Sequence, residues 1–142
     1  MDRIQVSNWE KLGQGHETIL IVEDEPLMAR LLEKVFSGHG YRVLLASDGE
    51  QAIEVFHCYK GRISLVLLDF GLPKITGWEV FLKIKEENPD VSIVIASGYL
   101  DPMIKAKMAY AGVMHFVNKP YILDEMVKTV KVLTTDPGRN YT

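Results

Sequence analysis

The sequence predicts an α/β fold of the doubly wound kind, in which a five-stranded parallel sheet carries helices on both faces. Three observations predict it. Strand and helix patterns alternate five times along the chain, and short connections join them, as expected when parallel strands are linked by helices. Because such crossovers are right-handed, few topologies remain. The length of 142 residues suits one domain with a full core.

The first strand and helix are marked by an apolar run and by helix-start residues. The run predicts a strand over about 18–23. Pro26 suits the first position of the following helix, with Asp24 or Glu25 as its N-cap, and Gly38 ends it. We expect this helix to bury a wide apolar stripe. The stripe is formed by Leu27, Leu31 and Val35, with Met28, Leu32 and Phe36 beside them.

The second and third units follow the same pattern. A strand is predicted over about 42–46, and a helix starts near Asp48. The third strand runs from Ile63 to Asp69, and a loop containing Gly and Pro separates it from a helix opened by the capping-box pattern of residues 76–79. Residues 88–89, Asn-Pro, close that helix. The second helix is expected to bury Ala52, Val55, Phe56 and Tyr59.

The last two units are shorter. The fourth strand covers about 91–97, and a short helix follows between Asp101 and Gly112. The fifth strand covers about 113–118, and the last helix about 122–133. We expect the short helix to turn Ile104, Met108 and Ala111 inward.

The two ends of the chain lack these periodic patterns. Residues 1–16 contain Gly13-Gln14-Gly15 and are interpreted as a flexible arm or linker. The folded domain is expected over 17–135, and residues 136–142 are interpreted as a tail.

Composition excludes several classes of protein. A hydrophobic content of 47% with 25% charged residues indicates a folded domain rather than a disordered one. The net charge of −3, without a block of Lys and Arg, gives no support to direct nucleic-acid binding. The single cysteine, Cys58, excludes a disulfide framework within the chain and a cysteine-based zinc site. No apolar stretch is long enough for a membrane span and no signal peptide is evident, so we expect a cytoplasmic protein.

Chemically active side chains follow four of the five predicted strands. Asp69 ends the third strand, Glu23-Asp24-Glu25 follow the first, Ser97-Gly98 end the fourth, and Asn118-Lys119-Pro120 follow the fifth. In an open parallel sheet, ligands bind at the carboxyl ends of the strands. Acids, a hydroxyl and a lysine at that edge suit a divalent metal ion and a phosphoryl group.

The two aspartates are central to this hypothesis. If the first and third strands are neighbours, Asp24 and Asp69 lie together, and a hard cation such as Mg²⁺ relieves the repulsion between their charges. Carboxylate-held metals commonly serve phosphoryl transfer. Asp69 is then the candidate nucleophile that forms an acyl phosphate, while Lys119 and Ser97 contact the phosphoryl oxygens.

These residues resemble a known family. Over about residues 17–135 the chain is similar to the receiver domain of two-component response regulators and hybrid histidine kinases. Each matching segment is short, but five of them occur in order at strand ends. They are Ile21-Val22-Glu23-Asp24-Glu25, Leu67-Leu68-Asp69-Phe70-Gly71-Leu72-Pro73, Gly77, Ala96-Ser97-Gly98-Tyr99 and Phe116-Val117-Asn118-Lys119-Pro120-Tyr121.

The resemblance implies a flavodoxin-like fold with strand order 2-1-3-4-5 and a magnesium-dependent phosphorylation site. Asp69 would be the phospho-acceptor and a metal ligand. Asp24 would bind Mg²⁺ directly, Glu23 would act beside it or through water, and the carbonyl of Gly71 would complete the metal site. Many relatives carry two aspartates where this chain has Glu23 and Asp24, so the reach of one acid differs here.

The resemblance also implies a switch. A phosphohistidine on a partner would donate its phosphoryl group to Asp69, and Ser97 and Lys119 would bind the phosphoryl oxygens. Phe116 stands at the switch aromatic position, and the bond between Lys119 and Pro120 would be cis. The fourth helix, fifth strand and fifth helix would then shift between two arrangements, and the acyl phosphate would later hydrolyse. Such a receiver is a signalling module rather than a turnover enzyme.

The implied partners are a histidine kinase or histidine phosphotransfer domain and an unidentified downstream protein or domain, with no membrane and no direct nucleic-acid contact. The sequence leaves homodimer formation open. The chain could be a single-domain regulator, a receiver cut from a response regulator, or the receiver of a hybrid sensor kinase. The lead-in Gly13-Gln14-Gly15-His16-Glu17-Thr18-Ile19-Leu20 resembles the Gly-rich joint ahead of hybrid-kinase receivers, which favours the hybrid kinase slightly.

Other interpretations remain. A degenerate receiver would serve only as a protein-binding scaffold. A phosphatase with an aspartyl nucleophile usually has a second acid two residues later, where this chain has Gly71, and a flavin binder would need a phosphate loop in place of the acids after the first strand. At single positions, Phe116 could be a core residue, Ser97 a turn residue, Glu23 a surface charge, and Tyr99 either a gate or a packing residue.

Overall fold

The structure, a computed structural model, describes residues 17–135 except 73–74 and 114. The predicted arm and tail, residues 1–16 and 136–142, lie outside the described residues, and so do Pro73 and Lys74 of the loop after the third strand. The predicted domain boundaries therefore stay a prediction.

Strands and helices alternate along the described chain, as the sequence predicts. The elements are β1 (Thr18–Val22), α2 (Pro26–Gly38), β2 (Arg42–Ala46), α3 (Gly49–Tyr59), β3 (Ile63–Asp69), α4 (Gly77–Glu87), β4 (Ser92–Ser97), α5 (Pro102–Tyr110), β5 (His115–Asn118) and α6 (Leu123–Thr134).

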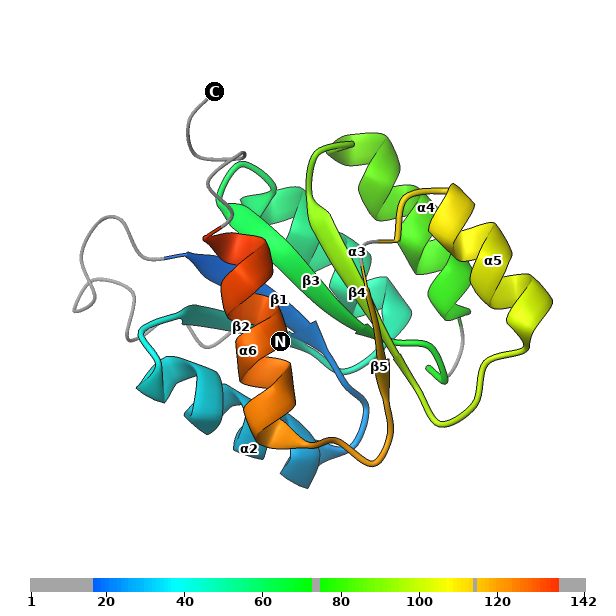
Figure 1. Cartoon of the computed structure of the whole chain (residues 1–142). Helices are drawn as coiled ribbons and strands as arrows, with labels where there is room; N and C mark the ends of the chain where they lie inside the picture. Colours follow the sequence, from blue (N-terminus) through cyan, green and yellow to red (C-terminus); the bar gives the residue numbers. More distant parts are fainter. Residues whose placement is uncertain (1–16, 73–74, 114, 136–142) are drawn as a thin grey trace.

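The strands form a five-stranded sheet in the order β2-β1-β3-β4-β5, and every neighbouring pair is parallel. Helices α2 and α6 cover one face, and α3, α4 and α5 cover the other (Figure 1). The predicted doubly wound, flavodoxin-like fold with strand order 2-1-3-4-5 is confirmed. Because β1 and β3 are adjacent, the residues that follow them meet at one edge of the sheet.

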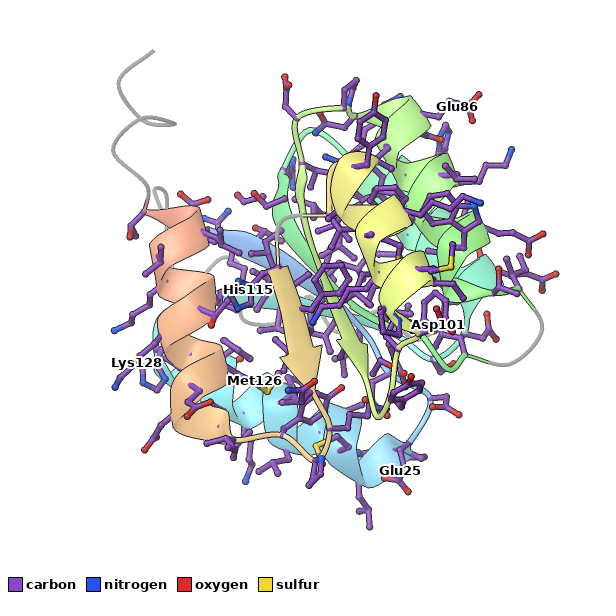
Figure 2. All side chains as sticks on the ribbon, turned by 45° about the vertical axis from the view of Figure 1, so that its right-hand side comes forward. Glu25, Glu86, Asp101, His115, Met126 and Lys128 are labelled. Carbon is purple, nitrogen blue, oxygen red and sulfur yellow. The ribbon has the colours of Figure 1, made fainter. Side chains whose placement is uncertain are left out.

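Two apolar cores lie on the two faces of the sheet. Alternate strand residues point to opposite faces, so Ile19 and Ile21 join one core while Leu20 and Val22 join the other. The first core contains side chains from α2 and α6, and the second contains side chains from α3, α4 and α5; Figure 2 shows these side chains between helices and sheet. The central strands are therefore sealed from water, apart from their carboxyl ends.

Side-chain caps fix the starts of four helices. Glu25, rather than Asp24, caps α2 and accepts a hydrogen bond from the Met28 amide. Asp48 and Asp101 cap α3 and α5, and Thr76 opens α4 with the predicted capping box. Since Glu25 serves as the cap, the carboxylate of Asp24 is left for the adjoining edge of the sheet.

The predicted buried faces of two helices were wrong in part. In α2, the predicted Leu32 and Phe36 are buried, and Met28 and Val35 pack against the core. Leu27 and Leu31, however, are 78% and 42% exposed, because the helix turns Ala29 toward the sheet in their place. In α5, Ile104 and Ala111 are exposed, and Met108 is the helix's one buried residue. Helix α5 lies toward the β5 edge of the sheet (Figure 2), and this edge strand has only 4 residues against which a helix can pack. No helix within the described residues has the length and apolar character to cross a membrane.

Candidate functional site

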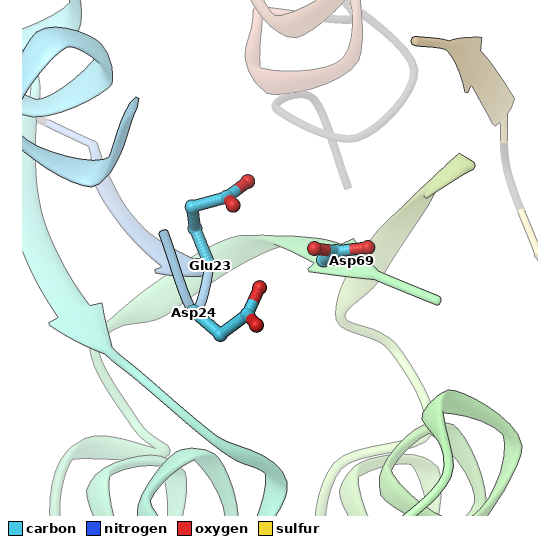
Figure 3. Close-up of side chains that lie close together, drawn as sticks. All are labelled: Glu23, Asp24 and Asp69. Atoms are coloured by element: carbon cyan, nitrogen blue, oxygen red, sulfur yellow. The ribbon is translucent and has the colours of Figure 1, made fainter. Parts of the chain in front are cut away.

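Three carboxylates meet where β1 and β3 end. Glu23 and Asp24 directly follow β1, and Asp69 is the last residue of β3. One oxygen from each carboxylate lies within 4.8 Å of the others (Figure 3). Glu23 and Asp69 are each only 3% exposed, whereas Asp24 is exposed. The parallel pairing of β1 with β3 therefore produces the predicted acidic cluster.

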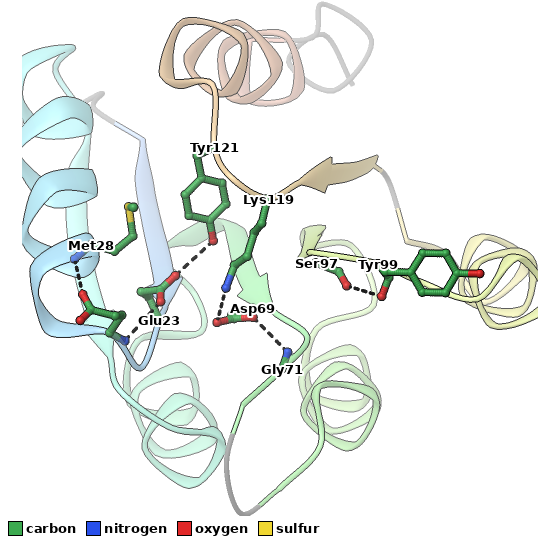
Figure 4. A network of polar contacts seen from close by, with 9 residues as sticks. Glu23, Met28, Asp69, Gly71, Ser97, Tyr99, Lys119 and Tyr121 are labelled. Carbon is green, nitrogen blue, oxygen red and sulfur yellow. Dashed lines mark hydrogen bonds and ion pairs between the residues drawn. The ribbon is translucent and has the colours of Figure 1, made fainter.

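Both oxygens of the Asp69 carboxylate are held by hydrogen bonds. The Lys119 ammonium donates to Oδ2 at 2.9 Å, and the Gly71 amide donates to Oδ1 at 3.0 Å (Figure 4). Burial by itself would lower the pKa of Lys119, but the hydrogen bond and charge of Asp69 outweigh it and raise that pKa. Lys119 thus stays an ammonium beside a buried carboxylate.

Glu23 is held just as firmly. Its Oε2 accepts from the Glu25 amide at 3.2 Å, and its Oε1 accepts from the Tyr121 hydroxyl at 3.1 Å (Figure 4). Burial raises the pKa of Glu23, while the Glu25 amide and the charge of Lys119 act in the opposite direction. These contacts make a surface-charge role for Glu23 untenable, since the side chain is buried and bonded within the site.

The sequence did not assign a role to Tyr121. Its ring lies 5.7 Å from the Lys119 ammonium, and burial together with the charges of Glu23 and Asp69 raises the pKa of its hydroxyl. The hydroxyl therefore stays protonated and can donate a hydrogen bond. The one available sequence signal was its position, two residues after Lys119 at the exit of a strand.

The donor set fits a hard divalent cation. Oxygen ligands from a carboxylate cluster are those that Mg²⁺ takes in proteins, usually with several retained waters. Asp24 and Asp69 would hold the ion, with Glu23 beside them. For Gly71, the structure gives the amide bond to Asp69, and the carbonyl's predicted part in the metal site remains a prediction.

Ser97 and Phe116 lie farther along the same edge. The Ser97 hydroxyl donates to the Tyr99 carbonyl at 2.9 Å, so it is turned to its own loop rather than to the Asp69 carboxylate (Figure 4). Phe116 is half-buried against the core, and the Lys105 ammonium lies 5.2 Å from its ring. Tyr99 is 78% exposed, so the interpretation of Tyr99 as a packing residue is wrong.

The backbone joins the lysine loop to the serine loop. The Lys119 amide donates to the Ser97 carbonyl at 2.9 Å, and the Lys119–Pro120 peptide bond is cis. The four predicted strand exits therefore converge at one edge, with Lys119 in direct contact with Asp69 and with Ser97 one loop away.

Comparison with known proteins agrees with this arrangement. The family model described as "Response regulator receiver domain" matches residues 19–131. The chain belongs to the response regulator receiver domain family. It is 38% identical over 118 residues to sporulation initiation phosphotransferase F of Bacillus subtilis, covering 82% of this chain and 92% of the relative.

Solved structures give the same fold. Response regulator protein TrrA from Thermotoga maritima, in complex with Mg²⁺ and BeF, has a TM-score of 0.71 and 31% identity, over 82% of this chain and 98% of that one. A receiver domain protein from Methanospirillum hungatei has a TM-score of 0.79 at 20% identity, over 88% of this chain and 98% of that one.

Membership in the family identifies the kind of protein. The chain carries a phosphorylatable receiver domain of two-component signalling with an acidic cluster of the metal-binding kind. It covers 92% of the Bacillus relative but only 12% of sensor kinase CckA of Brucella abortus, to which it is 26% identical. The matching unit thus occurs in proteins of very different length.

Proposed function

We propose that Asp69 accepts a phosphoryl group from a phosphohistidine on a partner, in a reaction that depends on a divalent cation. One observation carries this proposal. The Asp69 carboxylate is buried yet bonded to the Lys119 ammonium, and two further carboxylates lie against it at the open edge of the sheet. A structural carboxylate would have its charge balanced by the lysine alone, without two more acids beside it.

The acids account for the cation. Bound there, Mg²⁺ would neutralise the carboxylates and the charge that develops on the phosphoryl oxygens. The relative from Thermotoga maritima, crystallised with Mg²⁺ and BeF, supports this assignment. Asp24 is exposed and Glu23 and Asp69 are buried, so the cation site opens on the side where a donor would approach.

The contacts of Asp69 suggest how the transfer proceeds. The Gly71 amide holds Oδ1, and the Lys119 ammonium neutralises Oδ2. A carboxylate oxygen of Asp69 attacks phosphorus in line and forms the new P–O bond. The P–N bond of the donor breaks with its electron pair going to the ring nitrogen, and because the phosphohistidine ring carries a proton on its other nitrogen, it leaves as a neutral imidazole. Lys119 then moves from the carboxylate to a phosphoryl oxygen.

Ser97 is the proposed sensor of this change. Its hydroxyl bonds the Tyr99 carbonyl, and we propose that it turns to donate to a phosphoryl oxygen on Asp69. The turn would pull on the Tyr99 loop and, through Phe116, on β5 and the neighbouring helices α5 and α6. Phe116 is only half-buried, and its ring lies beside Lys105. This position supports the proposal that the ring changes its packing when Ser97 turns.

Exposed leucines beside the site support docking of the donor. Leu27 and Leu31 project from α2, whose first turn borders the hollow lined by Glu23, Asp24 and Tyr121. We propose that the apolar face of a donor helix covers these leucines, because buried apolar area is the main source of binding free energy.

The setting of the domain is a proposal as well. Coverage of nearly the whole Bacillus relative favours a single-domain regulator, whereas the match to a sensor kinase and the Gly13-Gln14-Gly15 segment favour a hybrid kinase. In the scaffold alternative, the domain has the same fold but binds a partner protein without being phosphorylated. A histidine kinase or phosphotransfer domain is the partner in both phosphorylated settings.

Intact-mass spectrometry tests the proposed function. The chain is incubated with acetyl phosphate and Mg²⁺, and Asp69→Asn is treated alongside. We expect one added phosphoryl group, absent from the variant and absent in EDTA. If a folded chain that binds Mg²⁺ gains no phosphoryl group from acetyl phosphate or from a phosphorylated histidine domain, the scaffold alternative replaces the proposal.

A further inference from the structure

Tyr121 links two loops that are far apart in the sequence. It lies between β5 and α6, and its hydroxyl reaches Glu23 directly after β1, 98 residues away. In Figure 4 the ring points from its loop toward the acidic cluster, alongside the Lys119 side chain. Tyr121 is therefore in contact with an acid of the proposed cation site and with the lysine of the proposed phosphoryl site.

The bond has a geometric consequence for Glu23. A glutamate side chain has three rotatable bonds, so a buried glutamate needs donors to fix its carboxylate. Here the Glu25 amide fixes Oε2 and the Tyr121 hydroxyl fixes Oε1. The amide belongs to the same loop as Glu23, so Tyr121 is the donor that joins the carboxylate to another part of the fold.

Side-chain length connects the two residues. An aspartate at position 23 would be one methylene shorter, and its carboxylate would withdraw from the Tyr121 hydroxyl, which lies 3.1 Å from Glu23 Oε1. The hydroxyl thus matches the glutamate of this chain and would not match an aspartate in its place.

We propose that Tyr121 is a positioning residue for the cation site, which sets the orientation of Glu23 through its hydroxyl. This inference rests on the proposed function, since it takes the acidic cluster to be that site. Loss of an outer hydrogen-bond partner of a metal-binding carboxylate typically weakens metal affinity by about 10-fold to 100-fold. Tyr121→Phe removes only the hydroxyl and keeps the ring.

A double-mutant cycle tests the inference on the unphosphorylated full chain. Mn²⁺ serves as the probe, and electron paramagnetic resonance counts the unbound ion for wild type, Tyr121→Phe, Glu23→Asp and the double variant. We expect Tyr121→Phe to weaken Mn²⁺ binding about tenfold beside Glu23 and less than about twofold beside Asp at position 23. Tyr99→Phe is the matched control, because this tyrosine is exposed and only its backbone carbonyl accepts a bond.

The outcomes separate the inference from the proposed function. Equal Mn²⁺ affinity of Tyr121→Phe and wild type, or an equal loss in both backgrounds, overturns the positioning role while the cation site stands. If wild type itself binds no Mn²⁺, or Asp24→Asn binds it as well as wild type does, the cation site is wrong and the inference falls with it. Thermal unfolding without metal shows that each variant is folded.

Discussion

At the scale of single residues, the charge balance around Asp69 decides what the site does. Three carboxylates share one sheet edge, and within the described part of the chain the one ammonium bonded to Asp69 is that of Lys119. In the proposed function, the lysine would both attract the incoming phosphoryl oxygens and compete with a cation for the same acids. Removing it should therefore move two measurable properties in opposite directions.

Lys119→Met is predicted to bind Mn²⁺ more tightly than wild type and to form the acyl phosphate about tenfold more slowly or worse. Cation binding gains because a positive charge beside the acids is lost, and phosphorylation slows because a phosphoryl contact is lost. Initial rates by intact mass and Mn²⁺ titration measure the two effects. The exposed Lys128 on α6 provides the control variant Lys128→Met, which should change neither property. Weaker Mn²⁺ binding by Lys119→Met would contradict the charge argument.

The sequence was informative about these residues because strand exits are readable from apolar runs. Asp69, Asp24 and Lys119 each follow such a run, and the parallel sheet brings them together. The contact between Tyr121 and Glu23 was not readable, because it depends on how a loop folds back over the sheet edge. The turn of Ser97 toward the Tyr99 carbonyl was hidden for the same reason, since a rotamer leaves no pattern in the sequence.

At the scale of elements, close packing at the start of α4 supports the loop that follows Asp69. Gly77 is buried, and a Cβ there would lie 2.9 Å from both Cα and Cδ1 of Phe70, the residue after Asp69. We predict that Gly77→Ala destabilises the domain by about 1–3 kcal/mol, because Phe70 has to move. Urea unfolding measures the change, and Mn²⁺ affinity should fall as well.

Gly38 is the matched control for this prediction. It is the last residue of α2, and a Cβ there would meet nothing within 4 Å. Gly38→Ala should therefore leave stability unchanged or raise it by up to about 1 kcal/mol, since alanine favours a helix. Equal effects of the two substitutions would rule out the contact with Phe70 as the cause.

The exposed face of α2 gives a second prediction at this scale. Leu31→Asp should slow phosphoryl transfer from a phosphorylated histidine domain at least tenfold while leaving the reaction with acetyl phosphate unchanged. The reason is that Leu31 is exposed on the proposed docking face and does not line the hollow beside the acids. Phosphorylation rates with the two donors are compared for each protein. An equal loss with both donors would mean that the substitution damages the site rather than docking.

The helix faces were the least predictable elements. The predicted stripe of α2 was right at Leu32 and Phe36, which are buried, but wrong at Leu27 and Leu31, which are exposed. Apolar residues on both sides of a helix make its orientation ambiguous from periodicity alone. In the sequence, the exposed leucines of the proposed docking face look the same as leucines of the core.

At the scale of the whole molecule, cation binding should be linked to stability. A ligand that binds the folded state alone stabilises it in proportion to the logarithm of its concentration over its dissociation constant. We predict that Mg²⁺ raises the Tm of wild type and that Asp24→Asn abolishes this rise. In EDTA, Asp24→Asn should be at least as stable as wild type, because one of three clustered negative charges is gone.

Differential scanning calorimetry in EDTA and at several Mg²⁺ concentrations measures this linkage. Glu86→Gln serves as the control, because Glu86 is an exposed acid on α4 outside the cluster, and it should keep the Mg²⁺-dependent rise. A Tm of wild type that does not change with Mg²⁺ would contradict a cation site in the folded domain.

The overall architecture was the most predictable level. Five alternations of strand and helix, short connections and right-handed crossovers predicted a parallel sheet with few possible topologies. The strand order itself was expected from the family resemblance, and the observed order β2-β1-β3-β4-β5 agrees with it. The position of the acids follows from that order, since β1 and β3 are neighbours. The same receiver fold occurs both in short regulators and in long sensor kinases, so the fold does not indicate which kind of protein this domain belongs to.

The most direct test of the central claim locates the phosphoryl group in the chain. The chain is phosphorylated with acetyl phosphate and Mg²⁺, and borohydride then reduces the acyl phosphate to an alcohol, which marks the acceptor aspartate as homoserine for peptide mass spectrometry. We predict homoserine at position 69 alone, and none in EDTA. Homoserine at another acid, or at none while the folded chain binds Mg²⁺, would contradict the assignment of Asp69 as the phospho-acceptor.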